Sequence, residues 1–246
     1  MAAGPHDARP EGHLRDDAPL SGSAFATPAP PASGRPLRLL VCAFGPFPGV
    51  PVNPSATVAR DLVRLSRPAL ADAELHLVIL PTRWDALGHL DALLAKLRPD
   101  GVLLFGVAAR RRRVCVEMLA VNAARPVPDA AHRHPACRRL DAAGPSVLRS
   151  TAGATARVAA LTRLGIAAAA SRDAGRYLCN ASYFHALAAT SGPAGSAPPV
   201  LFVHLPGRSG RPAGVSRQAL ARGVSELLVA LAAEARRAHR RRAQAR

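Results

Sequence analysis

The chain alternates short, almost purely apolar runs with segments of helical periodicity, and this alternation restricts the folds available to it. Apolar runs of strand length occupy residues 37–43, 75–80, 102–105 and 200–205. Between them, apolar side chains recur every three or four residues, as in a helix with one buried face. Strands that alternate with helices in this way favour a parallel sheet with helices packed against it. We therefore expect a single α/β domain, a three-layer α/β/α sandwich with a largely parallel mixed sheet.

Local signals predict where some of these elements begin and end. Asn53 followed by Pro54 is typical of a helix start, with an N-cap residue and a proline at the first helical position. Thr82 and Asp85 resemble a capping box for the next helix, which we expect to stop before Pro99.

The second half of the chain is less regular. Gly106 is expected to open a short loop after its strand, and residues 114–121 are expected to form another strand. Residues 123–150 contain several prolines and predict irregular structure, followed by a helix over residues 153–163 and a short alanine-rich strand. Two further helices are expected, one carrying Cys179 and one near the C-terminus.

The two ends of the chain differ from this central part. Residues 1–36 are rich in Pro, Ala, Gly and Ser and lack apolar periodicity, which predicts a disordered N-terminal extension. They also lack the apolar core of a secretory signal, and no apolar run approaches the roughly 18 residues needed to cross a membrane. We expect a soluble, cytoplasmic protein with no membrane partner, in which residues 37–246 form the domain and end in an arginine-rich tail.

The chain is strongly basic, with a formal net charge of +17 from 33 Lys and Arg residues against 16 Asp and Glu residues. Lys96 is the only lysine, so the positive charge is nearly all arginine, clustered at residues 110–113 and 236–246. No aromatic-rich basic strand or known nucleic-acid module accompanies these clusters, and we do not expect nucleic acid as a specific partner. The alternative is a basic surface that binds polyanions or nucleic acid with a steep salt dependence.

The cysteines do not indicate a metal site. None of the four belongs to a C-x-x-C pair, so a structural zinc site is not expected. Cys42 and Cys115 lie in apolar runs and are interpreted as small core residues. Cys137 follows His132 and His134 in a polar loop, where a chance cluster is favoured over a metal site. We expect no metal and no cofactor.

Glu117, Cys179 and His204 stand out because each closes or follows a predicted strand or turn at which distant parts of an open sheet meet. A cysteine nucleophile requires a base that accepts its proton and a third group that orients the base. Cys179 is expected in the first turn of a helix, where the helix dipole favours the thiolate. The same residues also fit an inert cysteine, a structural histidine and a solvent-facing glutamate, so spacing alone leaves both interpretations open.

Several stretches of the chain resemble the motifs of one peptidase family. Residues 171–184, SRDAGRYLCNASYF, follow the family pattern S-x-D-A-G-x-Y-x-C-N-x-x-Y-[YF] throughout. The family's glutamate motif is kept at Gly106, Ala108, Val114, Glu117, Ala120 and Asn122. Residues 44–55, with FGPFPG followed by NPS, resemble the family's F-G-P-F-G-G…N-P-S start, and residues 202–206 resemble the segment that carries its histidine. The chain thus resembles pyroglutamyl-peptidase I, also called pyrrolidone-carboxylate peptidase, from about residue 37 to its C-terminal helix.

This resemblance implies a cysteine exopeptidase, an omega peptidase that hydrolyses the N-terminal pyroglutamyl residue from peptides. It implies that Cys179 is the nucleophile, that His204 is the general base and acid, and that Glu117 orients the histidine. It also implies a homotetramer, a common assembly in the family, and peptides with N-terminal pyroglutamate as the partners.

The resemblance also implies five substrate-binding residues. Phe44 and Phe47 match positions that wall the lactam pocket, with loop packing as their alternative role. Asn53 matches a loop-organising residue, with the helix cap as its alternative. Val107 stands where the family has a glutamine that touches the substrate, and Arg125 resembles a family arginine near the site.

Most departures from the family cluster in one loop, and the others are Cys115, Met118 and the loop of residues 207–210. Val107, Ala109 and Arg110 replace a glutamine and two glycines, which changes both the contacts and the backbone freedom of the loop. They leave the three residues of the triad in place. The alternatives to a strict pyroglutamyl peptidase are therefore a homologue of altered specificity and a non-catalytic one.

Overall fold

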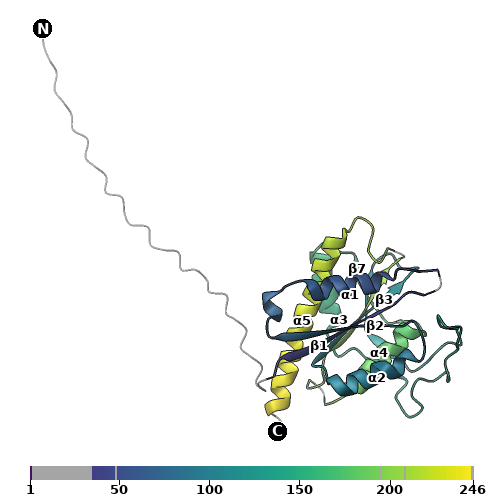
Figure 1. Ribbon diagram of the computed structural model, residues 1–246. Helices are drawn as coiled ribbons and strands as arrows, with labels where there is room; N and C mark the ends of the chain where they lie inside the picture. Colours follow the sequence, from purple (N-terminus) through teal and green to yellow (C-terminus); the bar gives the residue numbers. More distant parts are fainter. Residues whose placement is uncertain (2–34, 48, 194, 208, 245–246) are drawn as a thin grey trace.

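The structure is a computed structural model that describes Met1 and four segments of the chain, residues 35–47, 49–193, 195–207 and 209–244 (Figure 1). Most of the predicted N-terminal extension, residues 1–36, lies outside the described residues. Arg35, which belongs to that predicted extension, forms an ion pair with Asp100 at an N–O distance of 2.8 Å and so is part of the folded domain.

The centre of the fold is a six-stranded sheet. In chain order its strands are β1 Leu37–Phe44, β2 Ala73–Leu80, β3 Gly101–Ala108, β4 Val114–Glu117, β7 Ala168–Ser171 and β8 Val200–Pro206. Their order across the sheet is β2-β1-β3-β8-β4-β7. In this spatial order the first four strands, β2, β1, β3 and β8, run parallel to one another. β4 pairs antiparallel with β8 and parallel with β7. The sheet is therefore mixed and mostly parallel, as predicted.

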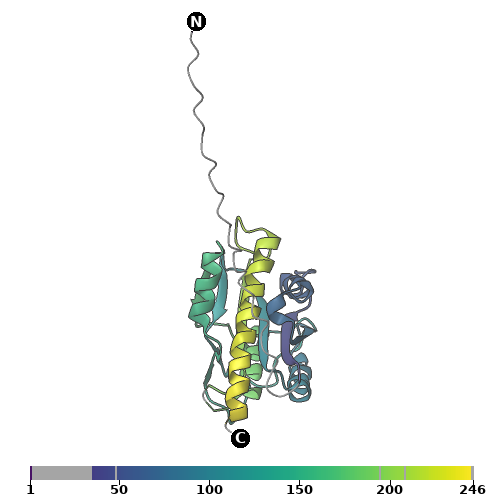
Figure 2. The ribbon, with the colours of Figure 1, turned by 90° about the vertical axis from the view of Figure 1, so that its left-hand side faces the viewer.

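Helices cover both faces of the sheet (Figures 1 and 2). They are α1 Pro54–Arg64, α2 Ala86–Leu97, α3 Ala154–Arg163, α4 Leu178–Ala189 and α5 Arg217–Gln244. Because successive strand residues point to opposite faces, β1 feeds both cores. Leu39 and Val41 pack in the core beneath α1, α3 and α5, whereas Leu40 and Cys42 pack in the core beneath α2 and α4. The predicted three-layer α/β/α sandwich is confirmed, and Cys42 is a core residue as expected.

The predicted strand over residues 114–121 is divided in two. β4 ends at Glu117, and β5 Leu119–Val121 pairs with β6 Val147–Arg149 in a separate two-stranded sheet. The side chain of Asn180 on α4 bonds to both the N–H and the carbonyl of Val121, at 2.8 Å each. This contact holds β5 against α4, away from the main sheet. β6, which pairs with β5, is a strand inside a region predicted to be irregular.

The predicted capping box at the start of α2 is wrong. α2 begins at Ala86, and the side chain of Asp85 makes no capping hydrogen bond. Thr82 instead donates to the carbonyl of Gly45 at 3.1 Å, and Asp85 pairs with Arg83 and Arg133. Contacts with Gly45, Arg83 and Arg133 have replaced the expected capping bonds. The short 3₁₀ helix Pro68–Leu70 precedes β2.

The predicted arginine-rich tail is helical through Gln244, as the end of α5. Figure 2 shows α5 running along the length of the molecule beside the sheet. Part of its charge is used internally, because Arg236 pairs with Asp72 and Arg242 lies 3.4 Å from Asp100. Among the helices of the described residues, none is both long enough and apolar enough to cross a membrane.

Candidate active site

The loop after β1 is held by a set of buried hydrogen bonds to a single carbonyl. Asn53 caps α1 by accepting from the N–H of Ser55 at 3.0 Å, as its sequence predicts. Its amide also donates to the carbonyl of Gly45 at 2.8 Å, and Thr82 donates to the same oxygen. Asn53 is buried, so its observed contacts are with the loop. These bonds fix the backbone between Phe44 and α1.

Cys179 is the second residue of α4, in the first turn of the helix as expected. The helix is fixed to its surroundings on either side of the cysteine. Asn180 binds Val121, and the hydroxyl of Tyr183 donates to the carbonyl of Glu117 at 3.1 Å. Tyr177, the N-cap residue, makes no side-chain capping bond to the helix. The first-turn N–H groups around Cys179 are thus not occupied by an N-cap side chain.

His204 and Glu117 form a buried pair across neighbouring strands. The Nδ1 atom of His204 lies 2.7 Å from Oε1 of Glu117, whose side chain is 0% exposed. Glu117 is opposite Phe202 in the register of β4 and β8, two residues before His204. The carboxylate therefore reaches the imidazole diagonally, on the face of the sheet that α2 and α4 cover. Because β4 runs antiparallel to β8, the end of β4 at Glu117 faces the middle of β8, and the two side chains meet there.

Gly106 places the cysteine next to the histidine. The sequence predicted that Gly106 opens a loop, but it lies inside β3, in register with His204 on β8. A Cβ atom on Gly106 would lie 2.7 Å from the Cys179 sulfur and 2.9 Å from Cζ of Phe202. Adjacent strands are about 4.8 Å apart. The Cys179 thiol therefore sits over β3, one strand from the imidazole, and a glycine is needed to make room for it.

The electrostatics of the pair favour a charged carboxylate. Burial opposes ionisation of Glu117, but the hydrogen bond from His204, the hydroxyl of Ser171 and the charge of Arg111 outweigh it. The pKa of Glu117 is consequently held below its usual range. An ionised carboxylate only accepts hydrogen bonds, so Nδ1 of His204 carries the hydrogen in this contact and Nε2 is the basic nitrogen.

The thiol itself is not ionised by its helix. Burial and the negative charge of Glu117 raise the pKa of Cys179 to about 12, although its own backbone N–H and Arg111 act in the opposite direction. The backbone N–H at the helix start does favour the thiolate, as predicted, but its effect is outweighed and the pKa of the thiol in the free protein is raised. Loss of hydration outweighs the field of the helix end, because burial removes the solvent that would stabilise the anion.

Arg111 is a site residue that sequence analysis missed. It was grouped with the exposed arginines of residues 110–113, yet its side chain is 27% exposed and pairs with Glu117 at an N–O distance of 2.6 Å. Its second amino group donates to the carbonyl of Asp173, in the turn before α4. Its spacing from Glu117 gives no periodic signal, but Arg111 stands where the family's G-Q-A-G-G-R loop has its arginine, and that match could have singled it out from its neighbours.

The predicted substrate residues occupy different settings. Phe44 ends β1 and is buried, whereas Phe47 is half-buried and its backbone pairs with Val50. Val107 is half-buried in β3, opposite Leu205. Each of these lies at or just beyond the end of a strand that reaches the site.

The backbone of Arg125 lies beside the turn that precedes α4. Its N–H donates to the carbonyl of Arg176 at 2.8 Å, three residues before Cys179, while its side chain is exposed. Next to it, the ring of Trp84 packs edge-on against Tyr177 at a centroid distance of 5.3 Å. The hydroxyl of Tyr177 donates to the carbonyl of Pro128. This aromatic pair, which sequence analysis also missed, holds the loop of residues 125–129 against the start of α4.

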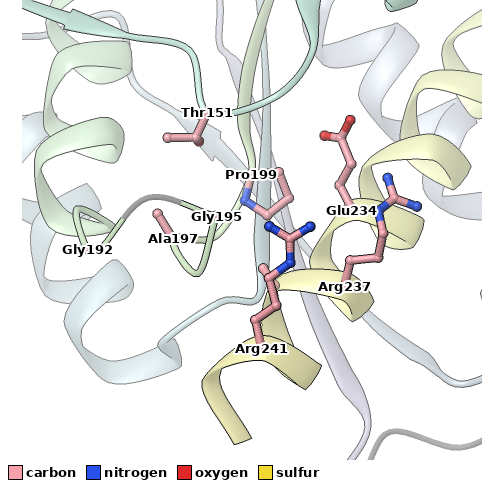
Figure 3. A pocket seen from close by; sticks show the side chains of 9 residues that line it. Thr151, Gly192, Gly195, Ala197, Pro199, Glu234, Arg237 and Arg241 are labelled. Carbon is pink, nitrogen blue, oxygen red and sulfur yellow. The ribbon is translucent and has the colours of Figure 1, made fainter. Parts of the chain in front are cut away.

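Other cavities lie away from the triad. One, of about 610 Å³, is lined by Trp84, Leu140 and His185 among others. A second, of about 290 Å³, lies where Arg241 of α5 reaches toward Pro199, just before β8 (Figure 3). Within the described residues no three His, Cys, Asp or Glu side chains are close enough to hold a metal ion.

Known proteins share this fold and these motifs. A family model described as pyroglutamyl peptidase matches residues 37–219. The pyrrolidone-carboxylate peptidase of Chromobacterium violaceum is 36% identical over 171 residues, which cover 68% of this chain and 77% of the relative. That of Streptococcus suis is 34% identical over 154 residues, which cover 61% and 69%. A mutant pyrrolidone carboxyl peptidase from Pyrococcus furiosus superposes with a TM-score of 0.68 and 27% identity, covering 79% of this chain and 98% of that one.

The mostly parallel α/β/α sandwich, together with these relatives, defines the chain as a cysteine hydrolase. It belongs to the pyroglutamyl peptidase family, as its motifs predicted.

Proposed function

We propose that this protein removes the N-terminal pyroglutamyl residue from peptides, with Cys179 as nucleophile, His204 as general base and acid, and Glu117 as the orienting carboxylate. The observation that carries the proposal is the 2.7 Å contact between His204 and Glu117, with the Cys179 sulfur one strand away over Gly106. The named relatives support the substrate, because they are pyrrolidone-carboxylate peptidases.

The first step is proton transfer coupled to attack. Since the Cys179 thiol is protonated in the free protein, its proton passes to Nε2 of His204 as the sulfur approaches the carbonyl carbon. Glu117 stabilises the imidazolium that results and keeps Nδ1 protonated. A new S–C bond forms, and the carbonyl becomes a tetrahedral oxyanion. The backbone N–H of Cys179, at the start of α4, is the proposed donor to that oxyanion.

The second step releases the shortened peptide. His204 returns its proton to the leaving amine, the C–N bond breaks, and a pyroglutamyl thioester remains on Cys179. Water then attacks the thioester carbonyl while His204 accepts a proton from it, the C–S bond breaks, and His204 returns the proton to the Cys179 sulfur. The products are free pyroglutamate and the regenerated thiol, so no oxidant, metal or cofactor enters the balance.

For recognition of the lactam we propose that Phe44 and Phe47 form the apolar wall. Asn53 contributes by holding their loop through Gly45, since its side chain is fully engaged there. Val107 supplies an apolar surface where the family glutamine would supply an amide, and Arg125 lies at the rim. This change favours weaker discrimination for the lactam amide than the family pattern implies.

The test is hydrolysis of pyroglutamyl-aminomethylcoumarin by the wild type, Cys179→Ala and Cys137→Ala. Cys137 is the matched control because it is an exposed cysteine outside the triad. We expect turnover by the wild type and by Cys137→Ala, and loss of at least about a thousandfold in Cys179→Ala. A folded wild type without turnover, or an active Cys179→Ala, rejects the proposal.

The same purified protein serves two further tests, of substrate specificity and of oligomeric state. Prolyl and glutaminyl coumarin amides test whether Val107 has changed the specificity of the enzyme. The homotetramer stays a prediction, and light scattering on the purified protein checks it.

A further inference from the structure

Arg111 joins three parts of the site that are distant in the sequence. One amino group of its guanidinium meets Oε1 of Glu117 at the end of β4, and the other meets the carbonyl of Asp173 in the turn that leads to α4. Its own backbone N–H donates to the carbonyl of Ala108 at 2.9 Å, at the end of β3. On the proposed function of the triad, we infer that Arg111 is a positioning residue. It holds Glu117 and the turn before Cys179 in their working geometry and supplies the site's fixed positive charge.

The geometry of Glu117 requires such a partner. Its Oε1 atom receives both His204 and Arg111, while within the described residues its buried Oε2 atom has no hydrogen-bond partner. A carboxylate held by a single imidazole can rotate about its terminal torsion, which is a soft one. The guanidinium removes that freedom, because it fixes the position of the oxygen that His204 shares. Burial of the charge without a cation would otherwise be costly.

The second contact acts on the nucleophile. The carbonyl of Asp173 belongs to a turn in which the Asp173 side chain accepts from the N–H of Gly175 at 2.9 Å. That turn leads within a few residues to Cys179. Arg111 thus ties the strand that carries the carboxylate to the segment that positions the sulfur. Its loss is expected to loosen the relation between Glu117 and Cys179 while the two cores, which lie on either side of the sheet, remain intact.

The charge of Arg111 has its own effect. The titratable groups around it are Glu117 and Cys115 of β4, His204 of β8, and Cys179 of α4. The hydroxyls of Ser171 on β7 and Tyr183 on α4 complete the surroundings of Glu117. A fixed cation favours the deprotonated form of every neighbouring acid and base. Removing it must therefore move the pH at which the triad loses its protons upward, whichever proton is considered.

Its neighbours provide the control. Arg112 is adjacent in the same loop and carries the same charge, but its side chain is exposed. Solvent and salt screen an exposed charge, so its removal should have little effect on the site. The comparison of Arg111→Met with Arg112→Met therefore separates a specific effect from the loss of one positive charge in an arginine-rich loop.

The experiment measures two pH profiles for the wild type, Arg111→Met, Arg111→Lys and Arg112→Met. The first profile is kcat/KM on pyroglutamyl-aminomethylcoumarin, with kcat and KM resolved at the optimum. The second is the rate of iodoacetamide alkylation of Cys179, mapped by mass spectrometry in a Cys137→Ser background. The second profile needs no substrate, so it still decides the role of Arg111 if the proposed function fails.

We expect Arg111→Met to lower kcat/KM by about tenfold to a hundredfold, mainly in kcat. Both of its profiles should move to higher pH by about 0.5 to 1 unit. Arg111→Lys keeps the charge, so its profiles should stay at the wild-type pH even where its rate is lower, and Arg112→Met should match the wild type. If Arg111→Met does not fold, Arg111→Gln supplies a second neutral variant with hydrogen-bond donors.

Two results would overturn the inference. One is a pair of profiles for folded Arg111→Met, or Arg111→Gln, that coincide with those of the wild type. The other is a shift of the same size in Arg112→Met or Arg111→Lys, which would show that the effect does not depend on a charge at this position.

Discussion

The close contact between Gly106 and Cys179 makes Gly106→Ala a sharp test of how the nucleophile is placed. The new Cβ atom would lie 2.7 Å from the sulfur and 2.9 Å from Cζ of Phe202. Ordinary contacts between such atoms are about 3.5–4.0 Å, so one of the three must move by roughly 1 Å. Gly106 lies in the central strand β3 and is paired there with His204 of β8, and Phe202 is fully buried. The sulfur is therefore the atom most free to shift.

A displacement of this size has a predictable cost. A misplacement of about 1 Å between reacting groups lowers the rate by about a hundredfold. Overpacking of a filled core costs about 1–3 kcal/mol of unfolding free energy, or a few degrees of Tm for each kcal/mol in a domain of this size. We expect Gly106→Ala to be folded and slightly less stable than the wild type. Its activity on pyroglutamyl-aminomethylcoumarin should fall, mainly through a lower kcat.

Gly88→Ala provides the matched control. Gly88 lies within α2, and no atom lies within 4 Å of the position its Cβ would take. Alanine should stabilise that helix by about 0.5–1 kcal/mol and leave kcat unchanged. The reasoning about Gly106 fails if Gly106→Ala retains the kcat of the wild type, or if its loss of rate is matched by Gly88→Ala.

Two further predictions concern stability. Asn53→Ala removes the cap of α1 and the side-chain hydrogen bond to the carbonyl of Gly45. It should lower the free energy of unfolding in urea by about 1–3 kcal/mol and raise KM, because the loop of Phe44 is released. An unchanged unfolding midpoint would contradict this prediction. Asp100 is 1% exposed; burial opposes its charge, but Arg35, the N–H of Arg38 and His239 hold its pKa below the usual range. A carboxyl whose pKa is lowered in the folded state stabilises the fold above its unfolded-state pKa of about 3.9, and this stabilisation is lost as the pH falls through its folded-state pKa. Asp100→Asn should therefore lower the unfolding free energy by about 3 kcal/mol at pH 7 and by progressively less below about pH 4. Tm scans of both proteins from pH 7 to pH 3 measure this difference. A difference between the two proteins that stays constant with pH would contradict the assignment.

Much of the fold could be predicted because the signals for it are local. The apolar runs that became β1, β3 and β8 are buried on both faces, so they contain few polar residues and are recognisable without knowledge of their neighbours. The cap of α1 is likewise local, since Asn53 bonds to Ser55 two residues away. The capping box at Thr82 failed for the opposite reason, because distant partners, the carbonyl of Gly45 and the side chain of Arg133, contact its two side chains.

The chain alone determined the class of its fold, its family and the identity of the three residues proposed for chemistry, because periodicity and contiguous motifs are properties of neighbouring residues. Only the tertiary structure decided how they are arranged. It separated Arg111 from the arginines beside it, placed Gly106 under a sulfur where a loop was expected, and surrounded Cys179 with groups that raise the pKa of its thiol. Each of these depends on distance and on the exclusion of water between segments far apart in the sequence, which no local pattern encodes.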